Sequence, residues 1–477
     1  MPEKHPNLLF VMADDMGAWA MHCAGNDEIY TPNLDRLAKM GTRLENLFCV
    51  SPVCSPARLS VYTGQIPSQH GVHDWLAKGH FDSKNVLSDE LKENFAKGDD
   101  MPYEYRWPSV SLADDSAIHY LRGNDTFTDK LAQAGYECGL SGKWHMGDSA
   151  KPQAGFTYWK TTGNGGENYM YPIVWEDGKM VMKHNCYVTD YITDNAVRFL
   201  EQRDQSRPFC LAVHYTAPHS PWSDKCHPWK YYDRYRDCPF NSIPTRPINH
   251  WVPGWDTPFE EWKKKPHPGV RFIHANYAPV EEVWDEYVLE SQKGYYAAVT
   301  GMDAGLGRIL DKLERDGLLE DTLIVFTGDN GSNMGHHGIV GKGNGTYPMN
   351  MYDTSVKVPG IFCWPGHIPE DYVNENMISH YDFLPTLLHL CGVEYEQPGR
   401  LPGHDVTELL ENRNVPDENE VVVFDEYGPV RMIRSHGWKL VHRYPDGPDE
   451  LFDLVNDPGE ETNLIDRPEL QTLRMYQ

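Results

Sequence analysis

The chain has 477 residues, with 43 Lys and Arg against 70 Asp and Glu and a formal net charge of −27. Its hydrophobic share of 40% and charged share of 24% are those of an ordinary globular protein, which excludes a disordered acidic chain, a collagen and a coiled-coil rod. The negative charge argues against nucleic acid or an anionic membrane surface as the main partner. No apolar run approaches the roughly 18 residues that would suggest a membrane span.

The first residues, Met1 to Pro6, are polar and show no apolar leader, so we expect a cytoplasmic protein. The ten cysteines include no CxxC pair and no zinc-like spacing with histidine, so most of them should be free, buried thiols. Asn7–Ala13 is an apolar run that predicts a buried strand, and Asp14 and Asp15 follow it directly. Thr31 and Pro32 predict the start of a helix that closes at Gly41.

Further elements follow in alternation along the chain. The expected strands and helices are Ala134–Leu140 (strand), Thr189–Gln202 (helix), Phe209–Tyr215 (strand), Gly294–Arg315 (helix) and Thr322–Phe326 (strand). Strands that alternate with helices predict an α/β fold, in which a large, mostly parallel sheet is sandwiched by helices.

Two stretches depart from this pattern. Residues 220–290 are dense in Pro, Trp and charge with weak periodicity, which predicts a long irregular insertion. Short strand candidates at Val421–Phe424 and Trp438–His442 follow a breaker-rich stretch. We therefore expect a domain over residues 1–399 that carries the insertion, and a smaller C-terminal α+β subdomain over 400–477 with a short antiparallel sheet.

Polar clusters follow four of the predicted strands, where an open α/β sheet binds its ligands. These are Asp14 and Asp15, Lys143 to His145, His219, and Asp329 and Asn330. Oxygen side chains from two parallel strands favour Ca²⁺ or Mg²⁺ over zinc. The alternative is that these residues only form turns. Two further carboxylates, Asp303 and Asp382, are typical of structural caps or ion-pair partners.

A sharper motif lies at Cys54-x-Pro56-x-Arg58, followed by Thr63 and Gly64. It resembles the signature of the formylglycine-dependent (type I) sulfatases of the alkaline phosphatase superfamily, in which the cysteine is oxidised to Cα-formylglycine. The segment from Gly135 to His145 matches the second signature of that family. Further matches cover nearly the whole chain outside 220–290, and they are Asp14-Asp15, Ala217-Pro218-His219, Gly328 to Gly331, Gly341 to Gly343 and Glu450 to Pro458. Ala57, Tyr62 and Cys138 differ from the residues that are commoner at these positions in the family. These differences would affect packing and not a chemical role.

The resemblance implies hydrolysis of a sulfate ester to an alcohol and inorganic sulfate. In the family, one hydroxyl of the hydrated aldehyde attacks sulfur. Deprotonation of the second hydroxyl then expels sulfate and regenerates the aldehyde. It further implies that the cation is held by Asp14, Asp15, Asp329 and Asn330 together with residue 54 itself (Cys54 in this sequence), with Ca²⁺ favoured and Mg²⁺ open. The implied catalytic residues are Arg58 to orient the hydrate, Lys143 and Lys342 to clamp sulfate oxygens, His219 as the acid for the leaving oxygen and His145 as the base for elimination.

Candidate substrate-binding residues are weaker, because loops that only pack are as common as loops that bind. They are His70, His73, Asp74, Trp75, His337 and Arg431. A strongly acidic protein should repel long polyanions, so we expect a small sulfated substrate, such as a saccharide. The sugar, the sulfate position and the oligomeric state stay open.

Other readings of the same motifs remain. One is a phosphonate or phosphate monoester hydrolase of the same superfamily, and another is a catalytically silent relative that binds sulfated glycans. A two-metal phosphotransferase or mutase would need histidine ligands, and the histidines here lie at sulfatase positions. Oxidation of Cys54 requires a formylglycine-generating maturase, expected to be of the radical S-adenosylmethionine type for a bacterial-type chain.

Overall fold

The computed structural model describes residues 5–76, 79–81, 87–97, 117–163, 165–243, 246–253, 281–411, 420–425, 429–445 and 447–470. Within these residues one large sheet has eight strands in the order β12-β2-β11-β8-β1-β7-β3-β4. Its strands are β1 (Asn7–Ala13), β2 (Thr42–Phe48), β3 (Glu137–Gly142), β4 (Tyr158–Thr161), β7 (Phe209–His214), β8 (Thr322–Gly328), β11 (Gly360–Cys363) and β12 (Tyr372–Ser379). Only β11 runs antiparallel to its neighbours in this sheet, which confirms the mostly parallel prediction.

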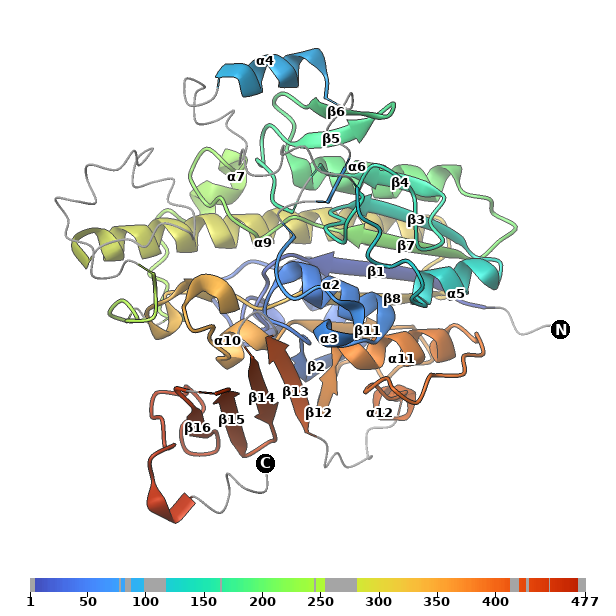
Figure 1. The fold of residues 1–477 in the computed structure, drawn as a ribbon. Helices are drawn as coiled ribbons and strands as arrows, with labels where there is room; N and C mark the ends of the chain where they lie inside the picture. The colour runs from blue at the N-terminus through green and yellow to red at the C-terminus, as the bar shows by residue number, and fades with distance from the viewer. Residues whose placement is uncertain are drawn as a thin grey trace.

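Helices cover both faces of the sheet, as Figure 1 shows. One face carries α1 (Pro32–Lys39), α6 (Val188–Gln202), α7 (Trp229–Tyr232) and α9 (Trp284–Arg315). The other carries α2 (Cys54–Thr63), α3 (Pro67–His70), α5 (Phe127–Gln133), α11 (Phe383–Leu390) and α12 (Thr407–Glu411). Strand β1 lies in the middle and alternates between the two cores, with Leu9 and Val11 in one and Leu8 and Phe10 in the other. Burial on both faces explains why its sequence is a continuous apolar run.

Smaller elements lie around the large sheet. They are α4 (Asp89–Lys97), α10 (Asp353–Val356), the hairpin β5 (Ile173–Glu176) and β6 (Lys179–Met182), and the short pair β9 (Asn333–Met334) and β10 (Val340–Gly341). Short 3-10 turns connect several of them, at His22–Ala24, Asp233–Tyr235, Glu281–Val283, His336–Gly338, Gly343–Gly345, His380–Asp382 and Pro468–Leu470.

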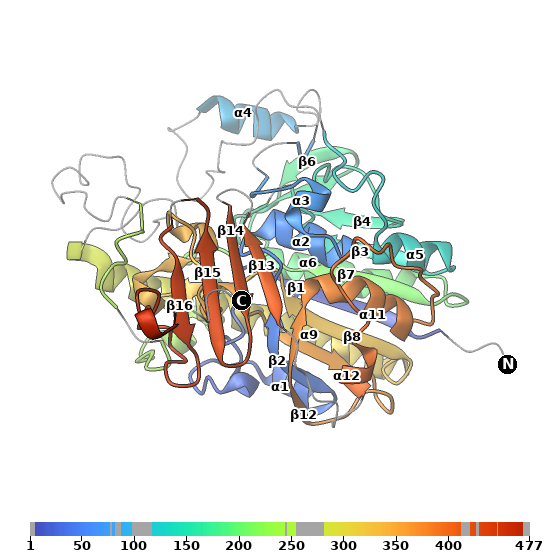
Figure 2. The same cartoon turned by 60° about the horizontal axis from the view of Figure 1, so that its bottom comes forward.

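A second, antiparallel sheet is formed by the C-terminal part of the chain. Its strands are β13 (Val421–Asp425), β14 (Val430–Arg434), β15 (Trp438–Arg443) and β16 (Glu450–Asp453), paired in that order. This sheet lies beside the β12 edge of the large one (Figure 2), and the Phe424 N–H donates to the Val50 carbonyl at 2.8 Å. The predicted short antiparallel sheet is confirmed, while the division at residue 400 stays a prediction.

Two predicted element boundaries were wrong. Strand β3 begins at Glu137 and not at Ala134, because Ala134 ends the unpredicted helix α5 and Gly135 makes the turn with φ 98°. Helix α9 begins at Trp284, ten residues before its predicted start. Its first turns bury Trp284, Tyr287 and Val288 at helical spacing, so the end of the predicted 220–290 insertion is regular helix. Residues 254–280 of that insertion lie outside the described residues.

The expectation for the cysteines holds. All ten cysteines are free, seven of them buried and three partly buried. In the part of the chain that the structure describes, no helix combines the length and apolarity needed to cross a membrane.

Asp303 of α9 caps helix α1, as expected of a structural carboxylate. Its Oδ1 accepts the N–H of Leu34 at 2.8 Å and that of Asn33 at 3.0 Å, and its Oδ2 accepts the Asn33 side-chain amide at 2.8 Å. The carboxylate is 1% exposed, so removal of its oxygens leaves N–H groups at the start of α1 without partners.

We expect Asp303→Ala to lower the free energy of unfolding by about 1–3 kcal/mol, the cost of losing a cap and stranding buried donors. Urea unfolding followed by circular dichroism measures this. The matched control is Asp311→Ala on the same helix, whose side chain is 60% exposed and pairs with Arg36, and which should change stability by less than about 1 kcal/mol. Equal effects of the two changes would contradict the capping role.

Candidate active site

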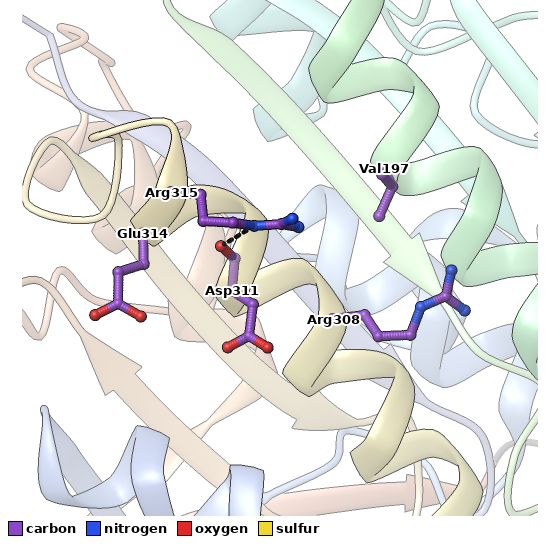
Figure 3. Close-up of a pocket in the computed structure, with 5 residues that line it drawn as sticks. All are labelled: Val197, Arg308, Asp311, Glu314 and Arg315. Atoms are coloured by element: carbon purple, nitrogen blue, oxygen red, sulfur yellow. Dashed lines mark hydrogen bonds between the residues drawn. The ribbon is translucent and has the colours of Figure 1, made fainter.

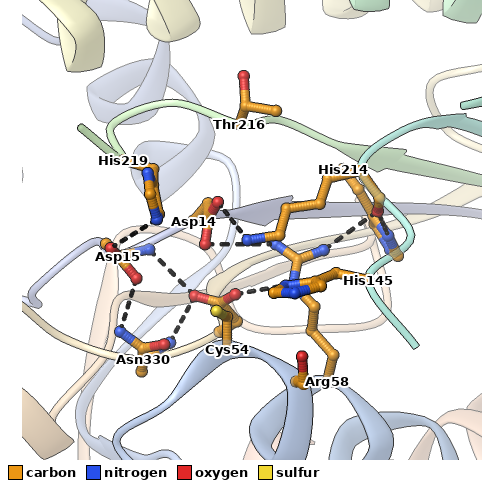
Figure 4. Close-up of polar contacts among 12 residues, drawn as sticks. Asp14, Asp15, Cys54, Arg58, His145, His214, Thr216, His219 and Asn330 are labelled. Atoms are coloured by element: carbon orange, nitrogen blue, oxygen red, sulfur yellow. Dashed lines mark hydrogen bonds and ion pairs between the residues drawn. The ribbon is translucent and has the colours of Figure 1, made fainter. Parts of the chain in front are cut away.

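The polar clusters predicted at the strand ends do meet, at the carboxyl edge of the large sheet. Asp14 and Asp15 follow β1, Lys143 and His145 follow β3, His219 follows β7, and Asp329 and Asn330 follow β8. Parallel pairing of β1 with β8 puts Ala13 beside Gly328, so the two acidic pairs leave the sheet side by side. Cys54 and Arg58 come from the start of α2 (Figure 4).

Three buried ion pairs join these residues. Arg58 Nε donates to Asp329 Oδ2 at 2.8 Å, Lys143 Nζ to Asp14 Oδ2 at 2.6 Å, and Lys342 Nζ to Asp15 Oδ1 at 2.5 Å. The first two pairs are fully buried, and the side chains of the third are about one tenth exposed. Charges in such surroundings are held only when they are paired and hydrogen-bonded.

Hydrogen bonds fix the two acidic pairs relative to each other. Asp329 Oδ1 accepts the N–H of Asp15 at 3.0 Å and that of Asn330 at 2.8 Å. The Asn330 amide donates to Asp15 Oδ1 at 3.0 Å. Asp15 adopts φ 62°, a conformation that costs free energy for a residue other than glycine and that turns the chain at the end of β1.

Carboxylate oxygens of Asp14, Asp15 and Asp329 lie within 4.8 Å of one another, as the one such metal-type cluster found among the described residues. Asp14 Oδ1 and Asn330 Oδ1 are buried and accept no hydrogen bond. Asp14, Asp15, Asp329 and Asn330 all offer oxygen ligands, and two of these oxygens accept no hydrogen bond. Such a set suits a hard divalent cation such as Ca²⁺ or Mg²⁺. The residues present therefore fit a metal ion.

The carboxylates differ in acidity. Burial raises the pKa of Asp14 to about 8, against the opposing effect of Lys143. Burial alone would also raise the pKa of Asp15 and Asp329. Lys342 and His219 hold the pKa of Asp15 below its ordinary value, and Arg58 with the two lysines does the same for Asp329. A bound cation would favour the ionised form of all three.

Cys54 is the first residue of α2 and is 2% exposed. Its Sγ lies 3.3 Å from Lys342 Nζ. Burial raises the pKa of the thiol, although Lys143 and Lys342 act against this. The side chain at position 54 therefore points at the ion-pair cluster, between the carboxylates and the cations, from the N-terminus of a buried helix (Figure 4).

The two predicted histidines lie on opposite sides of this cluster (Figure 4). His219 Nδ1 is 2.8 Å from the Ser220 carbonyl, so it carries the proton, and Nε2 faces Asp15 Oδ2 at 3.7 Å. His145 Nε2 is 3.0 Å from the Leu76 carbonyl, which leaves its buried Nδ1 without a partner. Burial lowers the pKa of His219 to about 4 and that of His145 well below its ordinary value, so each offers a neutral ring with a free nitrogen.

A glycine pair lies against both imidazoles. A Cβ atom on Gly165 would lie 2.3 Å from Cε1 of His145, and one on Gly166 would lie 3.1 Å from Cε1 of His219. Only residues without a side chain allow the backbone to come this close. These glycines belong to none of the sequence motifs, and only the fold shows what they approach.

The segment after α3 was predicted to bind substrate, and it divides into two parts. His70 is 7% exposed and packed inside, with Nε2 3.2 Å from Ser60 Oγ and Nδ1 3.2 Å from the Val72 N–H. His73 is exposed, Asp74 is half-buried and lies within electrostatic reach of Lys342, and Trp75 is 41% exposed.

The next residue, Leu76, ties this segment to the site. Its N–H donates to Ser55 Oγ at 3.0 Å, and its carbonyl is the partner of His145 and of His80. Trp75, with its exposed ring, therefore precedes a residue that contacts the site.

The other two substrate-binding candidates lie against neighbouring parts of the fold. His337 stacks on Tyr352 at 3.7 Å between ring centroids. Arg431 on β14 donates to the carbonyls of Asp425 and Val430 and lies over the ring of Phe424.

One residue beside the site was missed. His214 is fully buried, with Nδ1 3.0 Å from the Lys143 carbonyl and Nε2 3.1 Å from the Tyr62 hydroxyl. It supports the backbone that carries Lys143. Its position at the end of β7 is the signal that could have identified it, since the other site residues also follow strand ends.

A shallow depression on the helical face is unrelated to this chemistry (Figure 3). It is lined by Val197, Arg308, Asp311, Glu314 and Arg315. Helix α9 ends at Arg315, shortly before β8 begins, so the depression lies toward the opposite edge of the sheet.

An α/β/α fold with buried cations and an oxygen-rich metal-type cluster at the carboxyl edge of the sheet defines a hydrolase of anionic esters, of the alkaline phosphatase-like class. The sulfatase family model matches residues 6–393, and the chain belongs to the sulfatase family. A second model, the C-terminal region of N-sulphoglucosamine sulphohydrolase, matches residues 345–476.

Relatives of known name agree over the full length. The chain is 28% identical to the N-acetylglucosamine-6-O-sulfatase of Bacteroides thetaiotaomicron, over 98% of this chain and 84% of that protein. It is also 28% identical to the choline-sulfatase of Rhizobium meliloti, with the same coverage.

Solved structures show the same fold. A protein in complex with its substrate D-glucosamine-2-N,6-O-disulfate has a TM-score of 0.72 and 25% identity, over 99% of this chain and 96% of that chain. The phosphonate monoester hydrolase of Agrobacterium radiobacter has a TM-score of 0.70 at 21% identity, over 99% and 94% of the two chains, and shows the fold alone.

The chain is therefore a sulfuric ester hydrolase. Members of this family generally use a metal ion and a formylglycine. The site contains residues of the type that each group requires. They are a cluster of oxygen ligands for the metal ion and a buried cysteine beside this cluster for the formylglycine.

Proposed function

We propose that the protein hydrolyses a sulfate ester on a small saccharide, with a formylglycine made from Cys54 as nucleophile and Ca²⁺ held by Asp14, Asp15, Asp329 and Asn330. The observation that carries this proposal is the position of residue 54. Its side chain lies 3.3 Å from Lys342 Nζ, and Lys342 in turn pairs with Asp15 of the carboxylate cluster.

The charges of the site suit a sulfate ester. Three buried carboxylates are paired with three cationic side chains, so their formal charges cancel. A divalent cation then leaves a positive excess that an anionic ester can balance, inside a protein whose overall charge is −27. Preorganised cations of this kind stabilise the charge that shifts onto the ester oxygens in the transition state.

Each protein group has a task within this arrangement. The hydrate of formylglycine supplies a hydroxyl nucleophile when residue 54 is matured. Arg58 donates to Asp329 and to the Lys143 carbonyl, which fixes these two residues relative to each other. Lys143 and Lys342 bind ester oxygens. His219 would act as the acid after it takes up a proton at Nε2, where Asp15 Oδ2 at 3.7 Å favours the charged ring, and it would then give that proton to the leaving oxygen. His145 keeps Nδ1 available to remove a proton at residue 54.

Maturation makes Cys54 the sharpest test of the proposal. Protein produced together with a formylglycine-generating maturase should show an aldehyde at position 54 by mass spectrometry of the tryptic peptide, and should release inorganic sulfate from sulfated sugars. Cys54→Ala should keep the melting temperature and lose sulfate release by at least about 10³-fold, because it lacks the nucleophile.

A side-by-side assay of aryl phosphonate and phosphate esters separates the proposal from its rivals. A phosphonate or phosphate monoester hydrolase would turn these over faster than sulfates. A silent glycan-binding relative would bind sulfated sugar without turnover, even with the aldehyde in place.

Metal binding is tested apart from catalysis. After treatment with EDTA, Ca²⁺ should raise the melting temperature of the protein, because a ligand that binds only the folded state stabilises it. Mg²⁺ should raise it less. Asp329→Asn should weaken the Ca²⁺ response. Asp353→Asn, which changes a partly buried carboxylate outside the cluster, should keep it. Equal responses in these two variants would contradict the assigned ligands.

Trp75 supports a saccharide as the substrate. Its ring is 41% exposed and is next in the chain to Leu76, which contacts Ser55 and His145. An exposed aromatic face in this segment can stack on a sugar. Similar proteins support a sugar as well: one relative is an N-acetylglucosamine-6-O-sulfatase, and one similar structure is a complex with its substrate D-glucosamine-2-N,6-O-disulfate.

We expect Trp75→Ala to raise KM for a sulfated mono- or disaccharide about 10-fold, the order of one lost stacking contact. KM for a small acyclic alkyl sulfate should stay unchanged, because that ester has neither a ring to stack nor a quaternary ammonium to bind the indole face. The control is Trp229→Ala on α7, where the side chain is 58% exposed. An unchanged saccharide KM in Trp75→Ala would remove this residue from the substrate site.

A further inference from the structure

Lys342 differs from the other site residues in how it is held. Asp14, Lys143 and Asp329 come directly from the ends of large-sheet strands, whereas Lys342 comes from a loop between the short strand β10 and the turn at Gly343–Gly345. Its ammonium nevertheless reaches Asp15 at 2.5 Å and Cys54 Sγ at 3.3 Å. Other groups must therefore fix the main chain of this loop.

Asn350 is the centre of that support, and it is fully buried. Its amide nitrogen lies 3.2 Å from the Lys342 carbonyl, 3.1 Å from the Gly343 carbonyl and 3.1 Å from Thr346 Oγ1. Its Oδ1 accepts the Ser355 hydroxyl at 2.6 Å. One side chain thus ties the backbone of Lys342 to the rest of its loop.

A second asparagine completes the support. Asn333 Nδ2 donates to the Gly341 carbonyl at 3.0 Å and to Ser355 Oγ at 2.7 Å. Both asparagines therefore meet at Ser355, and the three successive carbonyls of Gly341, Lys342 and Gly343 each accept a side-chain hydrogen bond. Such a network is rigid because each buried polar group depends on its neighbour.

The C-terminal sheet holds this network from the other side. Lys439 and Arg443 lie on the buried face of β15. Arg443 Nη2 donates to the Met349 carbonyl at 3.0 Å, and Lys439 Nζ donates to the Met351 carbonyl at 2.9 Å. The two carbonyls are those of the residues on either side of Asn350.

The same cations are paired with carboxylates. Lys439 pairs with Asp353 and Glu460, and Arg443 pairs with Glu450. The main chain around Asn350 is therefore held between the large domain and β15.

We propose that Asn350 is a positioning residue for Lys342, and that β15 of the C-terminal sheet sets the position of Asn350 through Arg443 and Lys439. The proposal rests on the function proposed above, in which Lys342 binds the sulfate ester. According to this proposal, the C-terminal sheet affects the reaction indirectly, because it positions Lys342, which lies outside the sheet.

A double-mutant cycle on matured protein tests this proposal. Asn350→Ala should lower kcat/KM for a sulfated saccharide about 10- to 100-fold, since a displacement on the order of 1 Å in a catalytic group costs this much. In a Lys342→Ala background the same change should cost less than about twofold, because the group that it positions is gone. Arg443→Gln should follow the same pattern with a smaller first effect.

Asn374→Ala is the matched control for lost stability. Asn374 is also fully buried and donates to the Leu409 carbonyl at 2.7 Å, and it lies on β12, the edge strand of the large sheet. We expect it to lower the melting temperature as Asn350→Ala does and to leave kcat/KM unchanged.

Each outcome of the cycle has one meaning. Equal losses from Asn350→Ala with and without Lys342 would show a general structural effect and overturn the positioning role, as would full activity of Asn350→Ala. Full activity of Lys342→Ala would instead overturn the role proposed for Lys342 itself.

Discussion

The site depends on a balance between buried charges of opposite sign. Three carboxylates lie close together in the interior, where ionised groups are costly unless they are paired. Arg58, Lys143 and Lys342 meet this cost, one for each carboxylate. Burial raises the pKa of Asp14 to about 8 even though Lys143 lies beside it. A further positive charge next to this carboxylate would favour its ionised form.

This balance explains why the fold is built around its central strand. β1 delivers two of the three carboxylates, and its neighbours β7 and β8 deliver His219 and the third. Parallel strands bring all these groups to one edge without long loops. The cations come from three different places, α2, β3 and the loop after β10, so correct assembly of the whole domain is required before any carboxylate is neutralised.

Much of this arrangement could be predicted from the sequence, since apolar runs predicted the strands and polar clusters after them predicted the edge. Asp14, Lys143 and Asp329 stand at such strand ends, so periodicity alone places them together. The start of α9 at Trp284 could not be predicted in this way, because its first turns follow a stretch rich in proline and tryptophan. Histidine is a residue type that often binds substrates, but His70 is buried against Ser60. This burial depends on the tertiary packing and could not be predicted from the sequence.

Residues of ordinary type supply what the motifs leave out. Asn350 and Gly165 belong to no catalytic motif, yet one holds the Lys342 backbone and the other allows the chain to lie on His145. A motif lists the groups that meet the substrate, and the geometry of those groups is set by hydrogen bonds between parts of the chain far apart in sequence.

The C-terminal sheet illustrates the same division of tasks. It supplies Lys439 and Arg443, which are the cations that hold the segment around Asn350. They are paired with Glu460 and Glu450, so these two cations add little net charge near the site. The sheet thus contributes order to the site without changing its charge, and this separation leaves the electrostatic balance of the three carboxylates undisturbed.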